Sequence, residues 1–522
     1  MTLTKLTIGV AIAAVLLTLA IVFGHRKQKN IFISYLQCFT GALFIFSGWV
    51  KAIDPLGTAY KMEQYFAEFE STFEHTWFSF LAPLFPLLSE YAISFSVIMI
   101  IFEIVLGLML LIGSAPKFTS WAFFLLVAFF TFLTGFTFLT GYVPGEEVVV
   151  AQNGEQVLIS EFDNQEGLTP KDTLTAHFFN FGLWSEYKES NMKVTDCGCF
   201  GDFLKLKPKT SFFKDLFLLI PAILFLFYYK EMHQLFNSGT RTMMIGGVGV
   251  ALLIYCLSNY VWDLPHKDFR PFKKGVNVAE QKAYEAEATA VKVIGYELTN
   301  KTSGEKVQLN MDEYLKRFKE FPKKEWDYEQ LRSEPAMEPT KISDFAIEHP
   351  DGYEITEDLL SDPSYSLMIV AHKLYTDNIE SETFIRRDST FVMDTLVVGD
   401  TTELVKRLDS VVERPVTKSI YEWNDKYVKR WKEVVNPVLM EAEKAGWNIY
   451  AVSKPYESQT IEDFRQETQS AYPFYKADDI LLKTIVRSNP GIVLWKEGKI
   501  IDKWHFKKLP SFQEMEAEAK EN

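Results

Sequence analysis

The stretch AISFSVIMIIFEIVLGLMLLIG, residues 92–113, decides the fold class of this chain. It carries a single charge, Glu103, and an apolar helix of about 20 residues is what crosses the hydrocarbon core of a bilayer. Five other stretches of similar length and composition lie before residue 263. The six predicted membrane helices are therefore residues 6–23, 31–50, 92–113, 121–141, 212–229 and 243–261.

The rest of the chain is of a different kind. From residue 263 to 522 no apolar run of that length occurs and charged residues are frequent, which predicts a soluble half. The net charge of −14 excludes nucleic acid as a partner, because phosphates would be repelled. We expect an N-terminal anchor with a basic connection, a membrane domain, a linker with a small β region, and a soluble domain, at residues 1–30, 31–262, 263–340 and 341–522.

Lysine and arginine mark the connections that stay in the cytoplasm. They lie between the first two helices at residues 25–29, after the third helix at Lys117, and between the last two helices at Lys230 and Arg241. These are alternate connections, so they agree on one topology, in a bacterial inner membrane. The first helix is interpreted as an uncleaved anchor, since basic residues follow it rather than precede it. The N-terminus and the soluble half are then periplasmic, as are the loops 51–91 and 142–211.

The loop 142–211 contains the motif Asp196-Cys197-Gly198-Cys199-Phe200-Gly201. Two thiols separated by one glycine can close into a small, strained disulfide that gains and loses electrons easily, and the periplasm permits disulfides. A structural bond here would close almost no loop and would stabilise little. No metal site is expected, because the nearest candidate ligand, His177, is distant in sequence. Cys197 and Cys199 are the predicted catalytic residues.

Glu103 is an acid in the middle of a predicted membrane helix, where a charge is costly. It indicates a proton path or a buried partner, or it ties helices together. Lys51 and Asp54, after the second helix, are expected to extend to the outer membrane interface. Cys38 and Cys256 lie in apolar stretches and are expected to pack there as small apolar side chains.

Two parts of the membrane half resemble known families. Residues 41–51 with Asp54-Pro55, and residues 102–107, resemble the DoxX family of helical membrane proteins. The Cys197-Gly198-Cys199 motif directly before a span resembles the MauE branch of that superfamily, which is associated with redox processes and with maturation of methylamine dehydrogenase. The resemblance implies a four-helix core over residues 31–229, similar to quinone-linked disulfide-forming enzymes, with a quinone as a candidate cofactor. The association with methylamine need not transfer to this chain.

The soluble half alternates helix and strand signals, which is typical of an α/β domain. We expect a short hairpin within residues 341–356, strands at 366–371, 447–453 and 499–504, and helices at 432–444 and 460–469. Ser488-Asn489-Pro490-Gly491 before an apolar strand resembles the end of the thioredoxin fold, where a cis-proline precedes an antiparallel hairpin. Residues 341–510 resemble the TlpA or redoxin branch of that fold.

This domain departs from thioredoxin-like enzymes at the place where they carry their reactive cysteines. After its first central strand it reads His372-Lys373-Leu374-Tyr375, and no cysteine follows Cys256. An insertion of about fifty residues, near 378–425, comes next and is either functional or flexible. The domain is expected to bind an extended peptide rather than to exchange disulfides, and the resemblance places that contact at Asn489, Pro490 and His372.

Three functions fit these residues. The first is a thiol–disulfide oxidoreductase or redox accessory, in which Cys197 and Cys199 exchange electrons with a periplasmic partner protein or with a quinone. The second is a non-catalytic assembly or maturation factor whose cysteine-free thioredoxin-like domain holds a client protein. The third, transport of a small molecule, rests on Glu103 alone.

Overall fold

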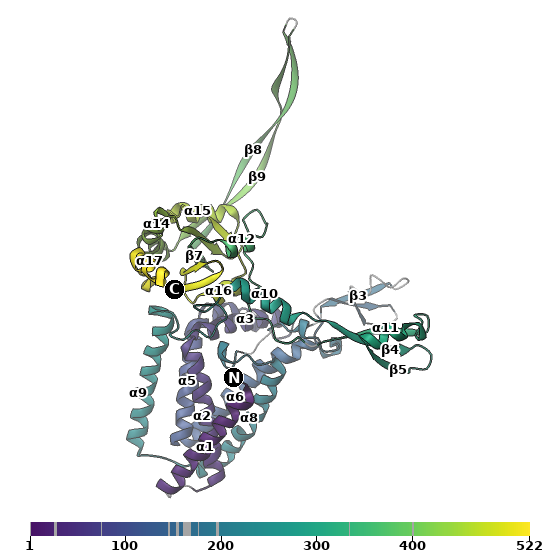
Figure 1. Ribbon diagram of the computed structural model, residues 1–522. Coiled ribbons are helices and arrows are strands. Elements are labelled where there is room, and N and C mark those ends of the chain that lie inside the picture. The colour runs from purple at the N-terminus through teal and green to yellow at the C-terminus, as the bar shows by residue number, and fades with distance from the viewer. Residues whose placement is uncertain are drawn as a thin grey trace. The chain divides into compact units, whose positions relative to one another are not determined.

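The computed structural model describes residues 2–25, 29–74, 76–144, 147–152, 156–159, 169–175, 177–194, 198–333, 335–398 and 401–521. These residues form two compact units, Met1–Arg270 and Pro271–Asn522, each with its own hydrophobic core (Figure 1).

Long helices dominate the first unit. Among the described residues, six helices are long and apolar enough to cross a membrane, which confirms the six predicted spans. They are α1 Leu3–His25, α2 Ile31–Ile53, α5 Ala92–Ile112, α6 Pro116–Leu139, α8 Pro208–Tyr228 and α9 Ser238–Leu257. Two further helices, α3 Pro55–Glu74 and α4 Leu84–Glu90, occupy the predicted loop 51–91.

Local sequence sets where these helices begin and end. Asn30 caps α2 by accepting hydrogen bonds from two backbone N–H groups of its first turn. Asp54 ends α2, and its Oδ1 accepts a hydrogen bond of 3.1 Å from the Gly57 N–H in the first turn of α3. Between α5 and α6, Gly113 adopts a left-handed φ of 64° and Pro116 opens the next helix. The turn between these two spans is therefore tight.

Helices α2 and α5 lie unusually close together. A Cβ built on Gly41 would lie 2.8 Å from the backbone oxygen of Gly107, so neither position has room for a larger residue without movement. Side chains of α2, α5, α6 and α8 share one core that includes Phe44, Leu106, Phe123 and Phe225. The close contact of α2 with α5 fixes which residues face each other further along the two helices.

A small sheet interrupts the connection between α6 and α8. Its strands are β1 Glu147–Ala151, β2 Gln156–Leu158 and β3 Pro170–Thr175, and their order is β2-β1-β3, with both pairings antiparallel. Short 3-10 turns then lead through Gly201–Phe203 to the start of α8.

A five-stranded sheet of order β11-β10-β7-β12-β13 organises the second unit. Strands β7 Ser366–Ala371, β10 Asn448–Ser453 and β11 Phe474–Lys476 are parallel, whereas β12 Gly491–Lys496 and β13 Lys499–His505 are antiparallel to their neighbours. The three strands predicted from sequence are confirmed within a residue at each end. The peptide bond before Pro490 is cis, as expected.

Helices cover this sheet and complete its core around the buried side chains of Trp431, Phe464 and Leu439. The helix predicted at 432–444 is a π-turn at Arg430–Val435 followed by α14 Asn436–Lys444, and the helix predicted at 460–469 is α15 Ser458–Thr468. The hairpin expected within 341–356 is reduced to one isolated bridge between Glu348 and Glu354. The remaining helices are α10 Val278–Thr289, α11 Met311–Arg317, α12 Thr356–Ser361, α13 Asp425–Lys429, α16 Asp479–Ile485 and α17 Phe512–Glu521.

Two further sheets belong to this unit. Strands β4 Val293–Asn300, β5 Lys306–Asn310 and β6 Trp326–Arg332 form a three-stranded sheet of order β5-β4-β6. The predicted insertion is a long antiparallel ribbon of β8 Thr376–Val398 and β9 Thr401–Trp423, which projects away from the five-stranded sheet (Figure 1). Its base is held by Trp423, whose ring lies 4.9 Å from that of Phe464 between centroids.

Candidate functional site

The loop that carries the dithiol is fastened to the membrane helices next to Cys199. Ser47 Oγ, on α2, donates a hydrogen bond of 3.0 Å to the backbone oxygen of Cys199. Gly198 has a φ of 60°, and a Cβ there would lie 3.2 Å from Cγ of Lys61, on α3. A glycine between the two cysteines therefore meets both a backbone and a packing requirement. Cys197 lies outside the described residues.

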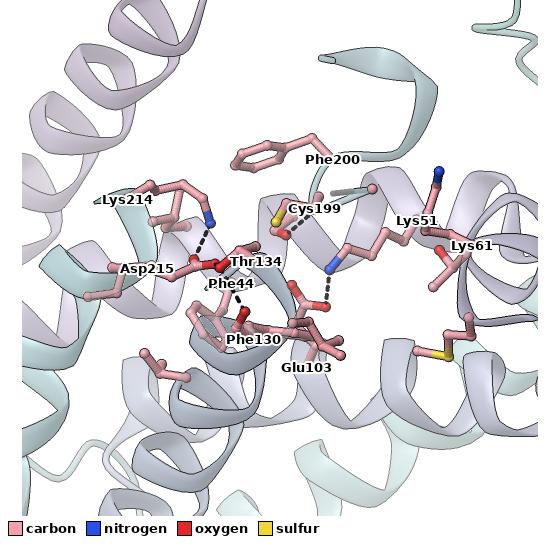
Figure 2. A pocket seen from close by; sticks show the side chains of 18 of the residues that line it. Phe44, Lys51, Lys61, Glu103, Phe130, Thr134, Cys199, Phe200, Lys214 and Asp215 are labelled. Atoms are coloured by element: carbon pink, nitrogen blue, oxygen red, sulfur yellow. Dashed lines mark hydrogen bonds and ion pairs between the residues drawn. The ribbon is translucent and has the colours of Figure 1, made fainter. Parts of the chain in front are cut away.

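Cys199 lines a cavity of about 60 Å³ inside the first unit (Figure 2). By volume this cavity has room for a small cluster of water molecules. Side chains from α2, α3, α5, α6 and α8 surround it, so five helices together build one site. The polar residues of the lining, apart from Cys199, are Ser47, Lys51, Thr58, Lys61, Tyr65, Glu103, Thr134, Lys214 and Asp215.

A buried ion pair joins α2 and α5 at this cavity. Lys51 Nζ lies 2.6 Å from Glu103 Oε2, and their side chains are only 6% and 3% exposed. The Lys51 ammonium also lies 4.9 Å from the ring centroid of Phe130. The expectation that Lys51 extends to the membrane interface is therefore wrong, since the close packing of α2 against α5 gives it a buried partner. For Glu103 the sequence left open a proton path, a buried partner or a tie between helices. The structure shows a buried partner, Lys51, which links α2 to α5.

The Lys51–Glu103 pair leaves polar groups unused. Among the described residues, Glu103 Oε1 accepts no hydrogen bond, and two of the three ammonium hydrogens of Lys51 find no acceptor. Thr58 Oγ1 is likewise buried without a hydrogen-bond partner in this part of the chain. Buried ions are stable only when their remaining lone pairs and hydrogens are satisfied. Water in the adjoining cavity is the natural partner for these groups.

A second charged pair faces the same cavity from α8. Asp215 pairs with Lys214 through Oδ1 and accepts a hydrogen bond of 3.0 Å from Thr134 Oγ1 through Oδ2. In the view of Figure 2 the Cys199 sulfur lies between this pair and the Lys51–Glu103 pair. Neither Lys214 nor Asp215 was predicted from the sequence. The available signal was their position two and three residues inside the predicted span 212–229, where adjacent charges are unusual.

Cations beside a thiol favour its thiolate form, which is the nucleophile in disulfide exchange. Three lysines, Lys51, Lys61 and Lys214, line the cavity together with Cys199, and two carboxylates, Glu103 and Asp215, balance part of their charge. The arrangement can therefore stabilise a thiolate and can also hold a proton close to it.

The residues predicted to bind peptide lie together in the second unit, but they are buried. Asn489 Nδ2 donates to the backbone oxygen of Lys373 at 2.6 Å, and Asn489 Oδ1 accepts from Tyr427 Oη at 3.0 Å. His372 follows β7 and is also buried, as is Pro490. Peptide binding at these residues stays a prediction, and it would have to use their backbone or their exposed neighbours.

Burial lowers the pKa of His372 from 6.5 to about 3, so this side chain is neutral at physiological pH. Nearby cations lower the pKa further, and they are Lys483, Arg487, Lys373 and Lys454. Within the described parts of the chain, no group of three or more His, Cys, Asp or Glu residues could hold a metal ion.

Comparison with known proteins bears on the first unit alone. Residues 29–144 match the family model described as methylamine utilisation protein MauE. The match begins just before α2 and ends after α6, so it includes Lys51, Lys61 and Glu103 but stops before the dithiol. No curated protein and no solved structure matches the chain. The similarity supports a helical membrane protein related to MauE over less than a quarter of the 522 residues.

Proposed function

We propose that the first unit is a membrane-embedded thiol–disulfide redox protein, in which Cys197 and Cys199 exchange a disulfide with a partner protein. The observation that carries this proposal is the position of Cys199 on a small cavity shared with the buried Lys51–Glu103 ion pair. A buried ion pair contributes little net stability, so its presence beside a thiol favours a chemical role over a structural one.

The compartment follows from the sequence. Basic residues lie in alternate connections, which favours a periplasmic position for the dithiol, the N-terminus and the second unit in a bacterial inner membrane. That compartment is oxidising, so a Cys-Gly-Cys pair there can cycle between thiols and disulfide.

A quinone fits the described residues poorly. The cavity beside Cys199 has a volume of about 60 Å³, which suits a few water molecules. A second, larger hollow of about 420 Å³ lies between α5 and α6, lined by aromatic and aliphatic side chains among which the Trp121 indole is the one hydrogen-bond donor. A quinone needs donors at its carbonyl oxygens. The predicted quinone therefore stays a prediction, and the redox partner in this proposal is a polypeptide disulfide or dithiol.

The family match gives the exchange a context. The matching family model is described as methylamine utilisation protein MauE. The resemblance of the sequence to the MauE branch implies an association with enzyme maturation. We take from this a role in maturing a periplasmic client, without transferring methylamine itself. In the second unit, the parallel strands β7 and β10, the antiparallel hairpin β12–β13 and the missing cysteines support a thioredoxin-like domain that binds the client rather than reacting with it.

Trapping in cells tests the exchange. Cys199→Ser or Cys197→Ser removes the resolving thiol, so one of the two variants should accumulate a mixed disulfide with the partner. Cells are quenched with acid and alkylated, and the adduct is identified by mass spectrometry after non-reducing electrophoresis. Cys38→Ser, which removes a buried thiol, is the matched control and should trap nothing. If neither variant forms an adduct and the dithiol never changes redox state, the proposal is wrong.

The alternative, a non-catalytic assembly factor, is favoured by one observation. The β8–β9 ribbon exposes many large apolar side chains, and an isolated two-stranded ribbon is marginally stable by itself. These side chains are Ile379, Phe384, Ile385, Phe391, Val392, Met393, Leu408, Val411, Val412 and Ile420. A client that covers the ribbon would explain them whether or not the thiols react.

A further inference from the structure

Every titratable group on the cavity of Cys199 belongs to one of two sets. Lys214 and Asp215 on α8, with Lys61 and Tyr65 on α3, have their polar atoms engaged by neighbours. Lys51 and Glu103 contact each other and otherwise face the cavity with unused hydrogen-bonding groups. Helix α6 adds Thr134 and apolar side chains but no titratable group.

The two carboxylates on the cavity, Asp215 and Glu103, differ in how many of their oxygens have hydrogen-bond partners. Both oxygens of Asp215 are occupied, one by Lys214 and one by Thr134. Glu103 has only Oε2 occupied, so Oε1 can accept a hydrogen bond or a proton from the cavity. Because the cavity is small and buried, separating a proton from the thiol without an acceptor nearby would leave an isolated thiolate charge, which is costly.

We infer that Glu103 and Lys51 are the proton-exchange pair of Cys199: Glu103 takes the thiol proton through water in the cavity, and the Lys51 ammonium then pairs with the thiolate. The proton transfer replaces the ion pair between Lys51 and Glu103 by an ion pair between Lys51 and the Cys199 thiolate. The number of buried charges is unchanged, so no additional charge has to be desolvated. This inference rests on the proposed disulfide exchange and assigns roles within it.

The step balances in atoms and electrons. The Cys199 thiolate attacks a disulfide of a partner polypeptide, forming a mixed disulfide and releasing one partner thiolate, which takes up a proton. The Cys197 thiol gives its proton to the first released partner thiolate and attacks the Cys199 sulfur, and the second released partner thiolate takes up the proton held by Glu103. The partner disulfide is reduced by two electrons and the dithiol is oxidised by two. In the reverse direction Glu103 returns its proton to Cys199 as that thiolate leaves.

The test uses the full-length protein with Cys199 as its single thiol. Cys38→Ala, Cys197→Ser and Cys256→Ala remove the other three of its four cysteines. The rate of alkylation of Cys199 by iodoacetamide, which reports the thiolate, is measured against pH in detergent solution. Glu103→Gln mimics the protonated carboxyl and leaves Lys51 unpaired on the cavity that Cys199 lines. Alkylation at pH 7 should become about tenfold faster, because an unbalanced cation at a shared site shifts ionisation by about one unit. Lys51→Met leaves Glu103 to repel the thiolate and should slow the reaction by about the same factor.

Three comparisons complete the test. Lys51→Arg keeps the cation and should restore a rate close to the parent protein. Glu231→Gln, which removes an acid that accepts a hydrogen bond from Asn30 before α2, should change nothing. Adding Glu103→Gln to Lys51→Met should raise the rate again, and this comparison serves if Glu103→Gln alone fails to fold.

Changes in the same direction for Glu103→Gln and Lys51→Met, or no change in either, would overturn the inference, since a purely structural pair would act in that way. Alkylation needs no partner protein. A missing mixed disulfide in cells would therefore refute the proposed exchange and leave this result standing, and the converse also holds.

Discussion

Ser47 Oγ donates a hydrogen bond of 3.0 Å to the backbone oxygen of Cys199, which connects helix α2 directly to the Cys-Gly-Cys motif. Ser47 is one turn from Lys51 on α2, and both residues line the cavity of Cys199. The Cys199 backbone is thus held by the same helix that carries Lys51 of the buried ion pair.

Removal of this hydrogen bond should loosen the dithiol loop. Ser47→Ala removes a partly buried donor, which is worth about 1 kcal/mol. We expect dithiothreitol to reduce the Cys197–Cys199 disulfide severalfold faster in this variant. Ser47→Thr keeps the hydroxyl and is the control. An unchanged rate in Ser47→Ala would mean that the hydrogen bond does not hold the loop.

The Lys51–Glu103 pair should matter for stability in a way that depends on how it is removed. Lys51→Met or Glu103→Gln leaves a buried charge unpaired and should cost about 3–5 kcal/mol. The double variant removes both charges and should be more stable than either single variant. Thermal unfolding in detergent, followed by circular dichroism, measures the difference. Equal losses that simply add in the double variant would argue against a coupled pair.

The predicted orientation can be tested with enzyme fusions. Alkaline phosphatase, which folds only in an oxidising compartment, should be active when fused after the last residues of the chain and inactive when inserted between α8 and α9. The Lys230 and Arg241 connection would then be cytoplasmic. The reverse pattern would place the dithiol in a reducing compartment and remove the basis of the redox proposal.

His372 should make the second unit less stable in acid. Its pKa is about 3 in the fold and 6.5 in an unfolded chain, so between these values the unfolded state binds more protons. The contribution of neutral His372 to the free energy of unfolding is fully present above pH 6.5 and is lost as the pH falls toward 3. Between pH 7 and pH 5 the free energy of unfolding should fall by about 2 kcal/mol.

Hydrogen exchange of β7 and β12 in the full chain, corrected for intrinsic rates, measures this loss. His372→Leu removes the titrating group and should flatten the decline. The same decline in both proteins would assign it to other groups.

The ribbon should be dispensable for folding and needed for binding. Ser381 pairs directly with Ser419, so residues 382–418 can be replaced by Asn-Gly, a turn that suits a two-residue hairpin. The base around Trp423 is retained, and the shortened protein should unfold at the parent temperature. We expect it to lose client proteins that the parent captures in a cross-linking experiment. Capture of the same clients would exclude the ribbon as their contact.

Some elements could be predicted because their signals are local. Strand β7 is a run of buried apolar residues, and the cis peptide bond before Pro490 followed from a short motif. The ribbon was visible as an unusually long insertion, but the extent of its pairing was not, since cross-strand partners such as Asp388 and Val412 are far apart in sequence. Helix α3 was missed because only part of its surface is apolar, as is typical of an amphipathic helix outside the hydrocarbon core.

The sequence alone determined that the chain has six apolar helices followed by a charged half. Hydropathy is a local property of a segment, and the length of an apolar segment decides whether it can cross a bilayer. It also identified Cys197, Cys199 and Glu103 as candidate functional residues. Only the tertiary structure decided that Lys51 lies against Glu103, and that both share a cavity with Cys199 and Asp215. Lys51, Glu103 and Asp215 come from three separate helices and Cys199 from a loop. The Lys51–Glu103 contact depends on the close approach of α2 and α5 at Gly41 and Gly107, which no local pattern specifies.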